Sequence, residues 1–188
     1  MAFFTDTPAA APWQSADLAP LTRERLCEAM DRANWGYGFD DADNMYTAWD
    51  LGYFFLYQLG DTEQILQVQG TWRPEIPADR LAELLVCCNN WSQEYLWPKL
   101  CVRPAGDGVI RIYAEHSADF RNGLTDEQLS NHLACAFSSS MRFFETLRDQ
   151  FPEIWATVEP PQDAATTADT PAAPDTSDTP ETSEATGA

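Results

Sequence analysis

The stretch from Leu81 to Leu147 constrains the fold of this chain most, because three different elements follow one another within it. Residues 81–95 carry one apolar stripe at helical spacing, which ends shortly before a proline and consists of Leu81, Leu84, Leu85, Cys88, Trp91 and Tyr95. Residues 100–115 alternate on both sides of an Ala-Gly-Asp-Gly turn, which is the pattern of a β-hairpin. Thr125 and Gln128 then form a capping box ahead of the last helix. The order helix, hairpin, helix predicts an α+β domain.

A helix and a three-stranded meander are predicted ahead of this stretch. Thr22 can cap a helix whose apolar positions recur at steps of four and three. Residues 45–49, 53–59 and 66–72 are predicted strands, because they are rich in aromatic and aliphatic residues and are separated by tight-turn sequences. In the third strand apolar residues alternate with glutamines, so one of its faces is wet. The whole order is α-β-β-β-α-β-β-α, an antiparallel sheet of about five strands with helices packed on it.

Composition divides the 188 residues into three parts. Residues 1–20 are rich in Ala and Pro and are expected to form a flexible N-terminal segment. Residues 21–155 hold enough aromatic and aliphatic side chains for one α+β domain. Residues 156–188 contain no Lys, Arg, His, aromatic residue, Leu or Ile. Such an acidic Ala/Thr/Pro-rich tail cannot bury enough apolar surface to offset its ordering entropy, so we predict that it is disordered.

The net charge of −19 limits the classes of partner. The tail supplies −7 of this charge, which leaves −12 for the rest of the chain, so the domain itself is acidic. A surface of this sign repels phosphate backbones and anionic membranes. We therefore expect neither a nucleic acid nor a membrane among the partners.

The cysteines indicate a reduced protein. They are scattered and odd in number, and each lies in an apolar pattern: Cys27, Cys87, Cys88, Cys101 and Cys135. This usage favours small buried thiols over a zinc site or a redox pair. The chain shows neither a basic-then-apolar N-terminal signal nor an apolar run of about 18 residues. We expect a cytoplasmic protein.

Two polar clusters invite a chemical function. The loop Asp40–Asn44 carries three aspartates, but the ligand spacing of a calcium loop fails after Asp43, which favours a solvated turn. His116 lies beside Glu115 and three residues before Asp119, yet no nucleophile motif accompanies it, so a packing role is expected. We predict no catalytic residue, no metal site and no cofactor. The alternative is a small-molecule-binding protein or a hydrolase using His116 and nearby acids.

An excess of Trp and Tyr is the feature with the best claim to function. Strand 53–59 is apolar on both faces, so one face meets the helices and the other needs a further cover. The sequence leaves open whether the Tyr53, Phe55, Tyr57 row or the Phe54, Leu56 row faces outward. It also leaves open a cover by the N-terminal segment with Trp13. Otherwise we predict a protein-binding surface, made of Tyr46, Trp49, Tyr53, Tyr57 and Trp72.

These segments together resemble the YbjN family of bacterial proteins, over roughly residues 21–152. The matching residues are Asn90, the strand Pro98-Lys99-Leu100-Cys101-Val102, the turn Gly106-Asp107-Gly108-Val109, the helix start Gly123-Leu124-Thr125-Asp126-Glu127-Gln128-Leu129, Phe143-Phe144 and Leu147. The resemblance implies the type III secretion chaperone fold, a twisted antiparallel sheet backed by helices that is often dimeric. It also implies a sensory-transduction regulator without established catalytic residues.

Two hypotheses of function therefore stand side by side. The first is a non-catalytic bacterial regulatory or chaperone-like module, in stress or sensory signalling, that binds an unknown protein partner or a second copy of itself. The second is the enzyme or small-molecule binder centred on His116. A flat aromatic patch would favour the first hypothesis, and a pocket that aligns His116 with a carboxylate and a nucleophile would favour the second.

Overall fold

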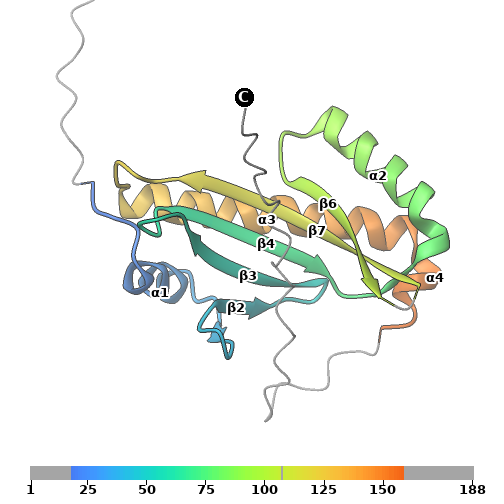
Figure 1. Ribbon diagram of the computed structural model, residues 1–188, viewed down its shortest axis with the longest axis horizontal. Helices are drawn as coiled ribbons and strands as arrows, with labels where there is room; N and C mark the ends of the chain where they lie inside the picture. Colours follow the sequence, from blue (N-terminus) through green and yellow to red (C-terminus); the bar gives the residue numbers. More distant parts are fainter. Residues whose placement is uncertain (1–17, 107, 159–188) are drawn as a thin grey trace, which may run out of the picture.

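A computed structural model describes residues 18–106 and 108–158 of the chain (Figure 1). The predictions of a flexible segment at residues 1–20 and of a disordered tail at 156–188 fall outside these ranges, apart from the three innermost residues of each segment. The elements in chain order are α1 (Arg23–Arg32), β1 (Gly38–Phe39), β2 (Met45–Ala48), β3 (Gly52–Leu59), β4 (Ile65–Trp72), β5 (Ile76–Pro77), the 3-10 helix η1 (Ala78–Arg80), α2 (Leu81–Glu94), β6 (Lys99–Gly106), β7 (Val109–Asp119), α3 (Asp126–Gln150) and α4 (Pro152–Trp155).

One antiparallel sheet holds all of the described strands. Its neighbours run β1-β2-β3-β4-β7, and β6 pairs with the other edge of β7. β5 pairs with Ile110 and Val109 of β7. Because β6 pairs with these two residues along one edge of β7, β5 must lie on the other edge, the one that β4 also uses. Pro74 separates β4 and β5 because it has no N–H for the ladder.

The predicted α+β class and antiparallel sheet are confirmed, but the expected count of about five strands is wrong. The described residues form a sheet of seven strands, and the two additional strands are β1 and β5. Each has only two residues, which is too short for a periodic pattern to reveal it. The predicted meander, hairpin and main helices are all present in the predicted order.

Side-chain caps begin two of the helices as the sequence predicts. The Thr22 hydroxyl accepts a hydrogen bond from the backbone N–H of Arg25, at 3.3 Å. Thr125 and Gln128 form the reciprocal capping box at the start of α3. Such caps satisfy donors that the first helical turn leaves free.

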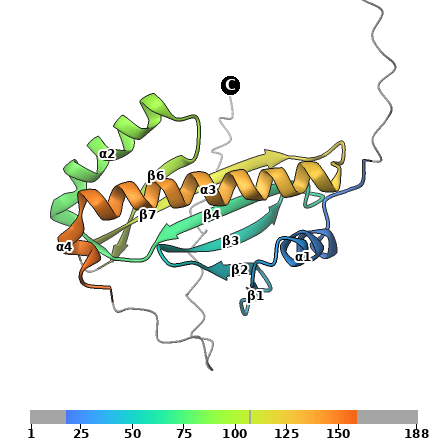
Figure 2. The ribbon, with the colours of Figure 1, turned by 180° about the vertical axis from the view of Figure 1, so that it is seen from behind.

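The helices form a layer on one side of the sheet. α3 runs behind the strands in Figure 1 and in front of them in Figure 2. Trp91 of α2 meets Phe143 of α3 edge to face, with ring centroids 5.2 Å apart, and Trp155 of α4 stacks on Trp72 of β4 at 6.1 Å. α1 contributes Leu26 to the same core. Among residues 18–106 and 108–158, no helix lies on the opposite face of the sheet.

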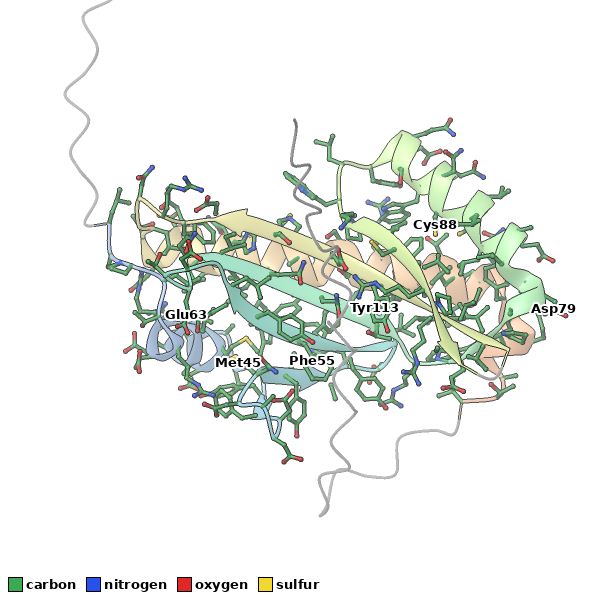
Figure 3. The ribbon with its side chains drawn as sticks, in the orientation of Figure 1. Met45, Phe55, Glu63, Asp79, Cys88 and Tyr113 are labelled. Atoms are coloured by element: carbon green, nitrogen blue, oxygen red, sulfur yellow. The ribbon has the colours of Figure 1, made fainter. Side chains whose placement is uncertain are left out.

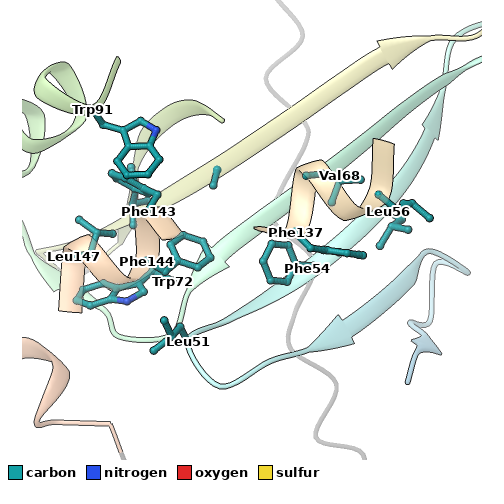
Figure 4. Close-up of a cluster of buried hydrophobic side chains, with 14 of the residues drawn as sticks. Leu51, Phe54, Leu56, Val68, Trp72, Trp91, Phe137, Phe143, Phe144 and Leu147 are labelled. Atoms are coloured by element: carbon teal, nitrogen blue, oxygen red, sulfur yellow. The ribbon is translucent and has the colours of Figure 1, made fainter. Parts of the chain in front are cut away.

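The core between α3 and the sheet contains a group of packed aromatic rings (Figure 4). Phe54 of β3 packs against Phe137 and Phe144 of α3, with centroid distances of 5.1 and 6.0 Å. Gly70 of β4 makes this packing fit, because a Cβ at that position would stand 2.6 Å from the Phe54 ring. The side of the sheet that carries Phe54 therefore packs in the domain's own core.

The apolar stripe of α2 differs from the prediction. Leu84, Cys88 and Trp91 are buried as expected, but Leu85 is 49% exposed. Cys87 takes a buried position instead. The difference arises because α2 lies at the end of the helix layer, where it meets β6 and, through Trp91, Phe143 of α3, so that a narrow side of it is covered (Figure 1). Within the part of the chain that the structure describes, no helix has both the length and the apolarity to cross a membrane.

Candidate protein-binding face

We call the side of the sheet opposite α3 the outer face. Strand alternation and register place one residue of each long strand in the same row across it, so that Tyr46, Phe55, Gln69, Glu115 and Lys99 are successive neighbours. The outer face comprises Tyr46, Tyr53, Phe55, Tyr57, Gln67, Gln69, Thr71, Lys99, Cys101, Arg103, Arg111, Tyr113, Glu115 and Ser117. Phe55 and Tyr113 appear on this face in Figure 3.

An aromatic group occupies the middle of the outer face. The rings of Phe55 and Tyr57 stack at 6.0 Å with an interplanar angle of 11°, and Tyr46 lies 6.1 Å from Phe55. Phe55, Tyr57 and Tyr113 are only 2%, 7% and 6% exposed. Burial raises the pKa of the Tyr57 phenol, and its hydroxyl has no hydrogen-bond partner among the described residues. These rings are not part of the core under α3.

The structure brings together three of the five residues that the sequence predicts for a binding surface. Tyr46, Tyr53 and Tyr57 share the outer face. Trp72 is 2% exposed and stacks on a helix on the other side of the sheet, and Trp49 lies against Phe137 there at 5.2 Å. The row left undecided by sequence is thereby placed: the tyrosines of β3 face away from the helices.

Glu115 is a buried carboxylate at the centre of an ion cluster on the outer face. It is 3% exposed and accepts hydrogen bonds from Lys99 Nζ at 2.7 Å, from Arg103 at 3.0 Å and from the Gln69 amide at 3.0 Å. The Cys101 thiol lies 3.7 Å from the same carboxylate. Sequence reasoning missed this cluster, although the hairpin register pairs Lys99 directly with Glu115. That register is a signal that could have revealed it.

Basic side chains gather at one end of the outer face, where β6 and β7 place Arg103 opposite Arg111, and we call it the basic end. Arg103 lies over the Tyr113 ring at 4.9 Å, and Arg73 lies over the Tyr53 ring at 5.3 Å. Arg111 pairs with Glu75 at 2.8 Å. With Lys99, these arginines place four cations against the two carboxylates Glu75 and Glu115. The net sign of this region is positive in a chain whose total charge is −19.

His116, the centre of the alternative hypothesis, lies on the other side of the sheet from Glu115. It is 5% exposed, and its ring is 4.6 Å from that of His132 in α3 and 5.1 Å from that of Trp97. Burial lowers the pKa of His116, and burial together with the neighbouring His116 lowers the pKa of His132 to about 4. Asp119 pairs instead with Arg121. The structure therefore does not align His116 with either predicted acid.

The acidic loop Asp40–Asn44 forms a tight turn. Asp40 Oδ1 accepts hydrogen bonds from the backbone N–H groups of Ala42 and Asn44, at 3.0 and 2.8 Å. Asp43 forms an ion pair with Arg23. Within the described ranges, no three His, Cys, Asp or Glu side chains are grouped so that they could hold a metal ion.

The comparison with family models identifies a family, and the comparison with solved structures concerns the fold alone. A family model described as "YbjN: Putative bacterial sensory transduction regulator" matches residues 22–149. The "Crystal structure of YbjN, a putative transcription regulator from E. coli" superimposes with a TM-score of 0.60 at 14% identity, covering 71% of this chain and 96% of that chain. The "Structure of the HopA1-SchA Chaperone-Effector Complex" gives a TM-score of 0.41 at 18% identity, covering 67% of this chain and 99% of that chain. No curated protein matches the sequence.

Proposed function

The chain belongs to the YbjN family, and from that premise we propose that it is a non-catalytic regulatory module that binds a protein partner on its outer face. The family description as a sensory transduction regulator supports a regulatory role. The E. coli YbjN structure supports the fold alone, because its identity is 14%.

The observation that carries the proposal is the aromatic group on the outer face, over which no helix of residues 18–106 and 108–158 lies. Tyr46, Tyr53, Phe55 and Tyr57 lie together there, next to the Glu115 ion cluster. Tyr and Arg are the residues that contribute most to binding energy at protein interfaces. Within this group Phe55 and Tyr57 are 2% and 7% exposed, whereas Tyr46 and Tyr53 are half-buried. A partner can therefore reach the aromatic group at Tyr46 and Tyr53.

Affinity capture from the native bacterium tests this proposal. The bait is the wild-type chain, and the two variants are Tyr53→Ala with Tyr57→Ala on the outer face, and Leu85→Ala with Val86→Ala on the exposed side of α2. We expect a protein that the wild type and the α2 variant retain and that the outer-face variant loses. Truncated interface aromatics typically cost about 2 kcal/mol or more of binding free energy, which is roughly a 30-fold loss of affinity.

The same variants test a second copy of the chain as the partner. Light scattering at micromolar concentration should then give twice the monomer mass for the wild type and the α2 variant, and a lower mass for the outer-face variant. Equal recovery of every captured protein, together with equal mass for all three chains, would contradict binding at the outer face. Circular dichroism of the outer-face variant verifies that it is folded.

A further inference from the structure

We propose that the acidic C-terminal residues 159–188 dock in cis on the outer face, and that a partner must displace them. Only the second clause rests on the proposed function, because it takes the outer face as the partner's site. Docking of the C-terminal residues concerns this chain alone. Its evidence is the point where the described chain ends, the charges of the two parts and the chemistry of the aromatic group.

The described chain ends beside the outer face. Val158 and Thr157 line the same surface hollow as Tyr53 and Arg73. The next 30 residues, 159–188, can span at most about 3.3 Å each, whereas neighbouring strands are about 4.8 Å apart. A segment of that length crosses the width of the sheet several times over. No long linker is needed before it reaches the basic end of the face.

The charges of the segment and of the face are opposite. Residues 159–188 carry seven carboxylates, no Lys and no Arg. The region around Arg73, Lys99, Arg103 and Arg111 carries a surplus of positive charge, because only two carboxylates pair with its four cations. Attraction between such groups acts over about 10 Å at moderate ionic strength. This attraction favours a position of the acidic segment near the basic region.

The aromatic group offers the segment two half-buried rings, Tyr46 and Tyr53, and no helix of the described ranges lies over the outer face. Phe55, Tyr57 and Tyr113 are at most 7% exposed, so they are not open to contact. The segment begins Glu159-Pro160-Pro161 directly after Val158. Proline-rich chains bind aromatic-lined surfaces at low entropic cost, because they are already extended. Proline on aromatic rings and carboxylate on Arg and Lys together give a weak, salt-sensitive contact.

Lys99 makes this contact directly testable, because it is the only lysine in the sequence. A water-soluble carbodiimide activates a carboxyl group, and Lys99 Nζ then forms an amide bond with it while the carbodiimide takes up the elements of water. Applied to the full chain at low micromolar concentration, it should join Lys99 to carboxylates of residues 159–188, alongside the adjacent Glu115. Mass spectrometry of the monomer fraction locates the bonds. We expect the tail products to disappear in about 1 M NaCl, where charges are screened beyond about 3 Å.

The control is a full chain in which the seven tail carboxylates are changed to their amides. Acylation of Lys99 by an amine-reactive ester should be at least about twofold faster in this variant, because a tethered segment is present at millimolar effective concentration in the wild type. Cross-links from Lys99 to Glu115 alone, or equal acylation rates, would overturn the inference. Cross-links that join ¹⁵N-labelled to unlabelled chains, without intramolecular ones, would overturn docking in cis.

These outcomes are separable from the test of the proposed function. If Lys99 fails to reach the tail but the Tyr53 and Tyr57 variant still loses a partner, the docking of the tail is wrong and the binding face stands. If the tail docks but that variant keeps every partner, the proposed function is wrong and the docking stands. With both confirmed, captured partner should increase at least about twofold with the amide variant as bait.

Discussion

Replacing Glu115 by Ala should destabilise the domain by about 2–3 kcal/mol. Removing one partner of a fully buried ion pair costs about 3–5 kcal/mol, because the remaining charge stays buried. Here the side chains of Lys99 and Arg103 are 70% and 41% exposed, so both cations can turn to water and the cost is lower. The Gln69 amide, which is 2% exposed, cannot do so and loses its acceptor, for about 1–3 kcal/mol.

Glu115→Gln separates the charge from the shape of this side chain. Glutamine keeps an acceptor for the Gln69 amide and nearly the same volume, but it gives up both ion pairs. We expect a cost of about 1 kcal/mol, since the cations are largely hydrated and the buried carboxylate no longer needs compensation. Glu75→Ala is the matched control, because it removes an ion pair whose carboxylate is 58% exposed. It should change the free energy of unfolding by no more than about 0.5 kcal/mol.

Urea unfolding followed by tryptophan fluorescence measures these differences, provided that the slope of free energy against urea is the same in all four chains. The reasoning is refuted if Glu115→Ala unfolds at the wild-type urea concentration, because the carboxylate would then be a surface group of no consequence. It is also refuted if Glu115→Gln costs as much as Glu115→Ala. In that case the charge, and not the buried amide, would carry the effect.

Three further predictions concern the core, the helix layer and pH. Gly70→Ala should lower the free energy of unfolding in urea by about 1–3 kcal/mol, because the new Cβ would stand 2.6 Å from the Phe54 ring. Gly36→Ala is the control and should leave the free energy of unfolding unchanged, because a Cβ there meets nothing within 4 Å. Equal urea midpoints for the two variants would contradict the packing of Gly70 against Phe54. Thr125→Ala removes the cap of α3 and should lower the free energy of unfolding by about 1 kcal/mol, with an unchanged thermal midpoint as the contrary result. Burial lowers the pKa of His132 from 6.5 to about 4, so the neutral ring is favoured in the folded state. Above pH 6.5 this group does not reduce the free energy of unfolding. As the pH falls from 6.5 toward 4, the free energy of unfolding decreases, because the unfolded state takes up the proton first. His132→Leu should therefore flatten part of the fall in thermal midpoint between these pH values, and an equally steep fall would disprove this role.

The family resemblance drawn from turns, caps and core spacing is confirmed by the match over residues 22–149. It could be recognised because these features are local in sequence. Thr125 and Gln128 are three residues apart, and the hairpin turn lies within one short segment, so neither depends on distant contacts. The assignment of the binding face could not be settled in the same way. It depends on how segments far apart in the sequence meet.

By itself, the sequence determined the order of the main elements and the alternation along each strand, since hydrophobic period and capping are properties of a few neighbouring residues. Only the tertiary structure decided which row of β3 faces the helices, because that strand is apolar on both sides and either row could bury against α3. The same step placed Trp72 in the core and brought Gln69 to Glu115 from 46 residues away. A charged group becomes buried and paired through cross-strand register, and that register exists only after the strands have paired in the folded sheet.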